Sequence, residues 1–203
     1  AKSTGGKADI GFKNPGLGSL AKILGLDFSA ALELQQKLES QLDFGDAASK
    51  KGKKEYLKQI GAYPLPKGSR TPTKEGMPYY NAGTKVLRKI RDDLLAAYLD
   101  MPIDDLKEHF LSTWIDAKGV YPYYIKATGF GKNGNYSAKV EDPLQNEKLK
   151  KLSSEHIELE ELASNSIGVW AGEGSDATKL FRIRLKWESA PLVSGIKLSG
   201  DPQ

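Results

Sequence analysis

The spacing of apolar residues predicts a chain that is helical in its first half and mostly β-strand in its second half. In the first half, apolar residues recur every three or four positions, which is the spacing of a helix with one buried face. The segments with this pattern are 27–42, 49–60, 84–99 and 104–115. Gly45 is expected to end the first of them, and Asp104 to cap the last.

From about residue 121 onward, short apolar runs separated by Gly, Pro and Asn predict strands. The clearest is 179–187, KLFRIRLKW, where Leu180, Ile183 and Leu185 are apolar and Arg182, Arg184 and Lys186 are predicted to face the other way. The other expected strands are 123–128, 136–140, 157–162, 167–171 and 193–198. The predicted fold class is α+β, with a helical N-terminal half and a mixed, mostly antiparallel sheet in the C-terminal half.

A chain of 203 residues can bury one sizeable core, so residues 1–203 are expected to form a single domain whose strand-rich part is 121–200. There is no cysteine and there are only two histidines, His109 and His156. This composition excludes disulfides, thiol nucleophiles and metal sites rich in Cys or His. No apolar run approaches the roughly 20 residues of a membrane helix, and the first ten residues lack an apolar signal segment. A cytoplasmic protein without a membrane partner is therefore expected.

Positive charge is concentrated in one part of the chain. The net charge is +4, but residues 47–91 carry 12 Lys and Arg against two acids, which gives +10 for this segment and −6 for the remainder. Such segregation favours a polyanionic partner, and duplex DNA is the partner we expect. The alternative is a solvated lysine-rich surface without a partner.

Residues 61–83 contain four prolines and four glycines and are predicted to form a long loop. The loop carries Tyr63, Tyr79 and Tyr80 among basic residues, a composition typical of nucleic-acid contact loops. The helix expected after it has cations in its first half, where they oppose the helix dipole. Phosphate contact would explain them, and so would pairing with Asp92 and Asp93. The predicted DNA-binding residues are Lys67, Arg70, Lys74, Lys85, Arg88, Lys89 and Arg91.

Two further patterns have ordinary structural explanations. Gly129, Gly131 and Gly134 form a GxGxxG pattern, but a strand is expected after it instead of the helix that a dinucleotide site requires. A β-hairpin turn is the preferred interpretation. Several acidic residues occur in adjacent pairs, including Asp104 and Asp105. Such pairs can bind Mg²⁺, but on helices they more often act as caps.

The segment 5–22, GGKADIGFKNPGLGSLAK, resembles the beginning of the catalytic core of PD-(D/E)xK nucleases, in particular type II restriction endonucleases. The later segments FLSTW and PYYIKATGFG, at 110–114 and 122–131, are also similar in style to members of that superfamily. The resemblance implies a Mg²⁺-dependent endonuclease that cuts duplex DNA. A homodimer is the form that it implies for such an enzyme. Asp9 would then hold the metal ion, and Lys22, on a short strand, would assist the attacking water.

The sequence departs from the superfamily pattern at one position. Leu20 stands where the acid of the (D/E)xK triplet is expected, and Glu33 on the following helix is the nearest candidate for a replacement ligand. The alternative function is that of a non-enzymatic phage or mobile-element protein, such as a virion component or a DNA-packaging factor. Such a protein would use the basic segment to bind DNA or an acidic protein surface.

Overall fold

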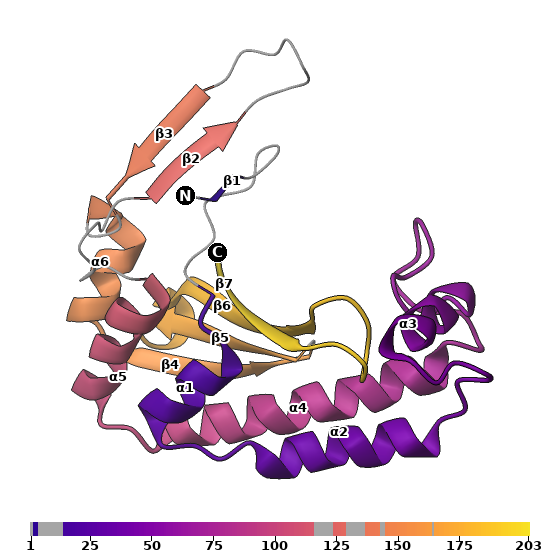
Figure 1. Ribbon diagram of the computed structural model, residues 1–203. Coiled ribbons are helices and arrows are strands. Elements are labelled where there is room, and N and C mark those ends of the chain that lie inside the picture. The colour runs from indigo at the N-terminus through magenta and orange to yellow at the C-terminus, as the bar shows by residue number, and fades with distance from the viewer. Residues whose placement is uncertain (1, 4–13, 116–123, 129–136, 143–144, 164) are drawn as a thin grey trace. The chain divides into compact units, whose positions relative to one another are not determined.

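The computed structural model describes residues 2–3, 14–115, 124–128, 137–142, 145–163 and 165–203, and Figure 1 shows the arrangement of its elements. The chain divides into two compact units. The helical unit consists of Gly16–Ala97 and Leu185–Lys197. The sheet unit consists of Ala1–Pro15, Tyr98–Arg184 and Leu198–Gln203. The predicted α+β class is confirmed, because the helices lie mostly in the N-terminal half and a four-stranded antiparallel sheet lies in the C-terminal half.

Four helices form most of the helical unit. They are α1 (Leu17–Leu24), α2 (Ser29–Gln41), α3 (Lys50–Gln59) and α4 (Met77–Leu99). The sequence predicted α2 and α3 nearly as they are, because a polar residue shortly before each helix accepts a hydrogen bond from a free N–H group. Ser49 caps α3 by accepting a hydrogen bond from the Gly52 amide at 3.0 Å. Asp27 accepts one from the Ser29 amide at 2.8 Å, and this bond lowers the pKa of the Asp27 carboxyl group.

Two secondary-structure predictions were wrong in this unit. The short strand expected around Lys22 is part of helix α1, because Leu17, Leu20 and Leu24 recur at helical spacing and Leu20 is fully buried. Helix α4 begins at Met77, seven residues before the predicted start at 84, so Tyr79 and Tyr80 belong to the helix and not to a loop. Pro78 lies within the first turn of α4, where the missing N–H costs no intrahelical hydrogen bond.

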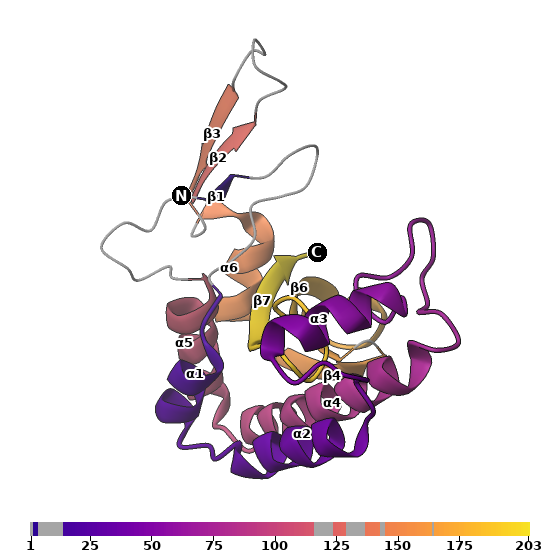
Figure 2. The same ribbon diagram turned by 45° about the vertical axis from the view of Figure 1, so that its right-hand side comes forward.

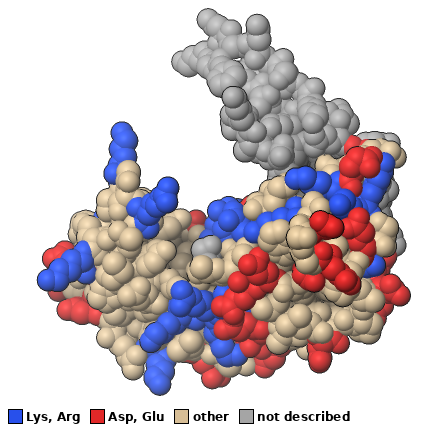
Figure 3. Space-filling view, turned by 180° about the vertical axis from the view of Figure 1, so that it is seen from behind, with Lys and Arg blue, Asp and Glu red and all other residues tan. Residues whose placement is uncertain are grey.

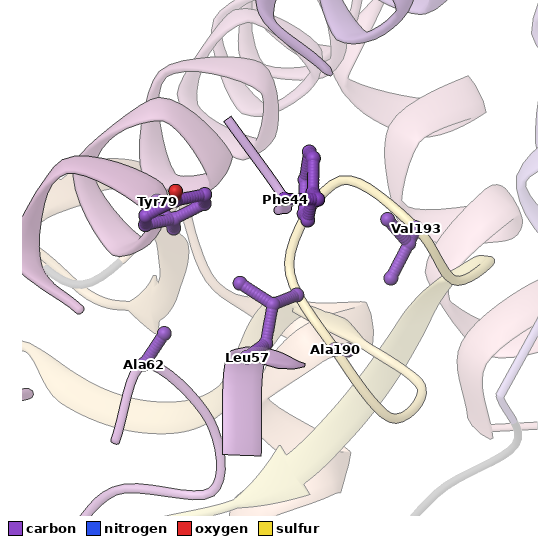
Figure 4. Packing of buried hydrophobic residues seen from close by; sticks show 6 residues of the cluster. All are labelled: Phe44, Leu57, Ala62, Tyr79, Ala190 and Val193. Carbon is purple, nitrogen blue, oxygen red and sulfur yellow. The ribbon is translucent and has the colours of Figure 1, made fainter. Parts of the chain in front are cut away.

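The core of the helical unit includes a cluster of six buried residues, shown in Figure 4: Phe44, Leu57, Ala62, Tyr79, Ala190 and Val193. The rings of Phe44 and Tyr79 meet edge to face, with centroids 5.3 Å apart. The Tyr79 hydroxyl donates a hydrogen bond to the carbonyl oxygen of Asp43. Burial is the main reason why the pKa of Tyr79 is raised. The cluster therefore fixes the beginning of α4 against the segment that precedes α3.

Two sheets and several short helices form the sheet unit. Strands β1 (Lys2–Ser3), β2 (Tyr124–Thr128) and β3 (Ser137–Glu141) make one sheet, in which β2 and β3 are antiparallel as the predicted hairpin requires. Strands β4 (Ile157–Leu162), β5 (Ser166–Ala171), β6 (Thr178–Trp187) and β7 (Ile196–Pro202) make the second, with β7 beside β6 in Figures 1 and 2. The remaining elements are α5 (Ile103–His109), the π-helix η1 (Phe110–Ile115), α6 (Glu147–Ser154) and the 3₁₀ turn η3 (Gly174–Asp176).

The predicted alternation of buried and exposed residues along β6 is interrupted by a β-bulge. Thr178 and Lys179 pair with Ala171 and Trp170, and the next pair is Phe181 with Val169, so Leu180 is the extra residue. Leu180 and Phe181 are consequently both buried, and the buried positions continue at 183, 185 and 187. From the sequence alone, Phe181 is assigned to neither face of the strand. Its ring packs edge to face against the ring of Phe110, with centroids 5.3 Å apart and an interplanar angle of 90°. The cations of β6 face away from this core, as predicted.

Candidate nucleic-acid interface

The loop between α3 and α4 is closed at its base by close contacts and hydrogen bonds. The Thr73 amide donates to the Gly61 carbonyl at 3.3 Å, and the Thr73 hydroxyl donates to the Ile60 carbonyl. The Gly76 amide donates in turn to the Thr73 hydroxyl oxygen at 3.0 Å. The buried side chain of Ala62 connects this base to the core cluster. A compact loop whose ends meet and whose tip projects into solvent is a common platform for binding residues.

The loop carries three of the predicted DNA-binding residues, and all three are exposed: Lys67 and Arg70 at the tip, and Lys74 at the base between Thr73 and Gly76. Hydrogen bonds within the tip hold its backbone. Ser69 donates through its amide to the Pro66 carbonyl at 2.9 Å, and the Thr71 amide donates to the Ser69 hydroxyl oxygen at 3.1 Å. The structure therefore holds the backbone around Lys67 and Arg70 by tip hydrogen bonds and that around Lys74 by the base hydrogen bonds.

Helix α4 presents three further predicted residues on one exposed face: Lys85, Arg88 and Lys89. Positions separated by three or four residues share a helix face, and Val86, Leu87 and Ile90 occupy the buried side. Lys89 pairs with Asp93, which confirms one of the ion pairs considered from the sequence. Neither Lys85 nor Arg88 forms an ion pair with any residue that the structure describes. The dipole of α4 gives these cations no support, since they lie near the middle of the helix, away from its C-terminal turn.

Arg91 does not belong to this surface. Only 4% of it is exposed, and its Nη2 atom lies 2.7 Å from Asp92 Oδ1. A buried guanidinium with a carboxylate partner serves packing and charge compensation, so the prediction of Arg91 as an exposed phosphate contact was wrong. No residue near Arg91 in the sequence marks it as buried, because position 91 only borders the apolar stripe of α4 that includes 90 and 94.

Helix α3 adds cations that the sequence-based site prediction did not include. Lys50, Lys51 and Lys58 are exposed, and its first turn contains no acid. Lys53 is engaged elsewhere, because its Nζ lies 2.9 Å from Glu39 and 5.0 Å from the centre of the Phe44 ring. The charge count of the segment 47–91 was the signal that could have identified the exposed lysines of α3. Nine of its twelve cations are exposed.

The described basic side chains do not form one continuous patch on the face drawn in Figure 3. On the face drawn in Figure 3, Lys and Arg side chains occur in several places with uncharged and acidic side chains between them. Of the tyrosines expected to stack on bases, Tyr79 is buried, whereas Tyr63 and Tyr80 are half-buried. The arrangement is suited to contacting phosphates at several points more than to stacking a row of bases.

The residues assigned to metal-dependent chemistry are only partly within the described chain. Asp9 lies outside the described residues. Lys22 is exposed on α1 and Glu33 is exposed on α2, so neither lies on a strand of a nuclease-like core. The described residues include no group of three or more His, Asp or Glu side chains arranged to hold a metal ion.

An open groove of about 570 Å³ lies in the helical unit beside a strained turn. Leu17, Leu32, Gln35 and the segment 192–196 contribute to its walls. Leu192 has a φ of 65°, and the Val193 amide donates to the Pro191 carbonyl across it at 2.7 Å, which is a γ-turn. Gln35 donates a hydrogen bond to the Leu192 carbonyl and so holds this turn. Sequence reasoning predicted a strand at 193–198 and missed both the turn and the groove.

The sheet unit contains a buried polar network around Tyr98. The Tyr98 hydroxyl accepts from Trp114 Nε1 at 2.9 Å and lies 3.1 Å from His109 Nε2, while His109 Nδ1 lies 3.4 Å from the Thr113 hydroxyl. Burial raises the pKa of Tyr98 and lowers the pKa of His109 to about 4. Because these groups stay neutral near pH 7 and are enclosed, the network holds α5 and η1 against Tyr98 within the sheet unit.

Comparison with known proteins adds no relative to this description: no family model, curated protein or solved structure matches the chain. Helices in the described part of the chain also lack the length and apolar composition needed to cross a membrane.

Proposed function

We propose that the chain is a DNA-binding protein that contacts the phosphate backbone of duplex DNA through the exposed cations of segment 47–91. The observation that carries the proposal is the combination of charge and exposure. The segment has a charge of +10, and nine of its cations reach solvent within one compact unit. Cations on this scale create a local potential that attracts polyanions.

The distribution of ion pairs supports the same proposal. Among the described residues, six predicted DNA-binding residues are exposed, and only Lys89 of these has an acidic partner. The phosphates of a duplex would supply the negative charge that the other five lack in the described structure. The loop, braced at its tip and at its base, supplies three cations whose backbone needs little ordering on binding, which lowers the entropic cost of association. DNA as the partner makes a cytoplasmic location part of the proposal.

The test is the salt dependence of binding to a labelled duplex of mixed sequence. Each neutralised phosphate lowers the slope of log affinity against log salt by about 0.9, so three to eight contacts give a slope of about −3 to −7 between about 50 and about 200 mM salt. Replacing Lys67, Arg70 and Lys74 together with Gln should weaken binding and reduce the slope by about 3. A flat salt dependence in the parent would overturn the proposal. A poly-glutamate competitor should not displace the duplex. Displacement by it at comparable charge would favour an acidic protein partner instead.

A further inference from the structure

The outward face of β6 in the sheet unit carries two arginines side by side. Arg182 and Arg184 are two positions apart on one strand, so their side chains leave the same face of the sheet. Ile183 lies between the two arginines in the strand and Phe181 precedes them, and both are fully buried on the opposite face. The two arginine side chains are partly exposed, at 29% and 38% of their surface.

One carboxylate serves both arginines. The Nη2 atoms of Arg182 and Arg184 lie 3.3 and 3.1 Å from the same oxygen, Oδ2 of Asp201 on β7. Two guanidinium charges therefore share a single negative charge, which leaves the group with one positive charge in excess. The two arginines and Asp201 belong to the sheet unit, whereas the basic segment 47–91 belongs to the helical unit.

The pairing of β6 with β7 places Ser199 on this face as well. Gln203 donates to the Leu180 carbonyl, and Glu188 donates to the Gly195 carbonyl, and both bonds belong to one antiparallel register. In this register Asp201 lies opposite Arg182, and Ser199 lies opposite Arg184. Ser199 is 5% exposed.

Three donors of this group are buried without a partner. Among the described residues, no hydrogen bond is made by Arg182 Nε, Arg184 Nε or Ser199 Oγ. Buried donors are almost always paired in folded proteins, because leaving one unpaired is unfavourable. In each arginine the Nε and Nη2 donors form part of a planar fork that matches two oxygens of one oxyanion. Asp201 uses only the Nη2 end of each fork.

We propose that Arg182, Arg184 and Ser199 form a binding site for a phosphate group. Because the three donors are buried in the free protein, binding requires the Asp201 side chain to move aside. A tetrahedral phosphate offers oxygens in several directions, so it can then accept from both Nε donors and the serine hydroxyl together, whereas the single shared oxygen of Asp201 cannot. A phosphate monoester also carries more charge than a carboxylate near pH 7 and so competes for the excess positive charge. The site is independent of DNA binding by segment 47–91.

The direct readout is the NMR signal of the arginine side-chain Nε–H groups in the full chain. Inorganic phosphate and a nucleoside 5′-monophosphate are titrated separately, with chloride at matched ionic strength as the reference. We expect the Nε–H signals of Arg182 and Arg184 to shift saturably with one or both probes. Saturation with inorganic phosphate alone identifies free phosphate as the ligand, and tighter saturation with the nucleotide identifies a phosphomonoester. The absence of a saturable shift with either probe would overturn the proposal.

Variants separate the site from a structural ion pair. Asp201→Asn removes the competing carboxylate and should tighten phosphate binding about fivefold, as expected for removing one like charge at a partly exposed site. Arg184→Lys keeps the charge but removes the Nε donor, and it should weaken binding. Lys179→Gln is the matched control, because Lys179 is a cation of the same strand whose Nζ lies over the Trp170 ring at 5.0 Å. Unchanged or weaker binding in Asp201→Asn, with unfolding temperature preserved, would contradict the proposal, as would parental affinity in Arg184→Lys.

Discussion

Gly76 lies so close to Ala62 that a Cβ atom at position 76 would be 2.6 Å from both the amide nitrogen and the Cα atom of Ala62. This contact closes the base of the loop that carries Lys67, Arg70 and Lys74. It joins the beginning of α4 to the end of α3, on the side where Ala62 enters the core cluster. The loop tip is therefore positioned by a contact that only a residue without a side chain allows.

Gly76→Ala should destabilise the protein by about 1–3 kcal/mol, because the added methyl group would meet backbone atoms that cannot turn aside. Gly18→Ala is the control, since a Cβ at position 18 on α1 meets nothing within 4 Å. That change should be neutral or stabilise the helix by about 1 kcal/mol. Urea unfolding of the two variants and the parent measures the difference, and equal stability of both variants would show that the loop base is not closed in this way.

Arg88 and Arg91 are three residues apart on α4 and should give opposite phenotypes. Arg88→Ala removes an exposed cation, so DNA affinity should fall and the salt slope should decrease by about 1, while stability changes by less than about 0.5 kcal/mol. Arg91→Ala empties a buried site beside Asp92 and should lower stability by more than about 1 kcal/mol, with the salt slope unchanged. Lys37→Gln, an exposed cation of α2 outside the basic segment, is the control for binding. The pair is measured by chemical denaturation and by duplex titration at several salt concentrations. A weaker salt dependence of DNA affinity in Arg91→Ala would show that Arg91 does contact DNA.

Plasmid DNA should be bound but not cut in the presence of Mg²⁺. The reason is that Lys22 lies on a helix and Glu33 is exposed on the next one, whereas the nuclease resemblance requires the lysine on a strand beside its acids. Incubation with Mg²⁺ and with EDTA, followed by electrophoresis, makes the comparison. Discrete fragments that form only with Mg²⁺ and disappear in Asp9→Asn would show that the chain is a nuclease of the kind that the segment 5–22 resembles.

The stability of the protein should fall as the pH is lowered from about 6.5 to about 4. The neutral form of His109 is favoured in the fold because burial lowers its pKa to about 4 from its usual 6.5. Within this window the unfolded chain takes up a proton at His109 and the native chain does not, so stability decreases with decreasing pH, by on the order of 3 kcal/mol in total. Below about pH 4 this contribution is lost completely.

His109→Gln should be less stable at neutral pH but should lack this part of the pH dependence, because glutamine does not titrate. The chain offers a matched control in His156, its other histidine, which is exposed. Unfolding free energies of both variants between pH 7.5 and 4, in about half-unit steps, provide the test. If His156→Gln removed the pH dependence of stability instead, the dependence would belong to His156 and the prediction would be contradicted.

Local sequence determined the elements whose signals lie within a few residues. Helices α2 and α3 were predictable because polar residues such as Ser49 satisfy free amides at the exact point where apolar spacing begins. Strands β4 and β5 were predictable within one residue at each end, because Gly and Asn bound short apolar runs. The basic segment was predictable as well, since charge along the chain needs no structure to be counted. The α+β class follows from the order of these elements.

Tertiary contacts decided the features that depend on residues far apart in the chain. Pro78 and the glycines pointed to a loop, but Tyr79 is buried against Phe44, and this contact makes the segment from Met77 helical.

Leu180 and Phe181 are both buried because a bulge against Val169 and Trp170 interrupts the alternation, which no count of alternating residues along β6 could show. Arg91 is buried and Arg88 exposed although both are cations of one helix, because the unit covers only one side of α4. The sharing of Asp201 by two arginines depends on strand register, which the tertiary structure alone sets.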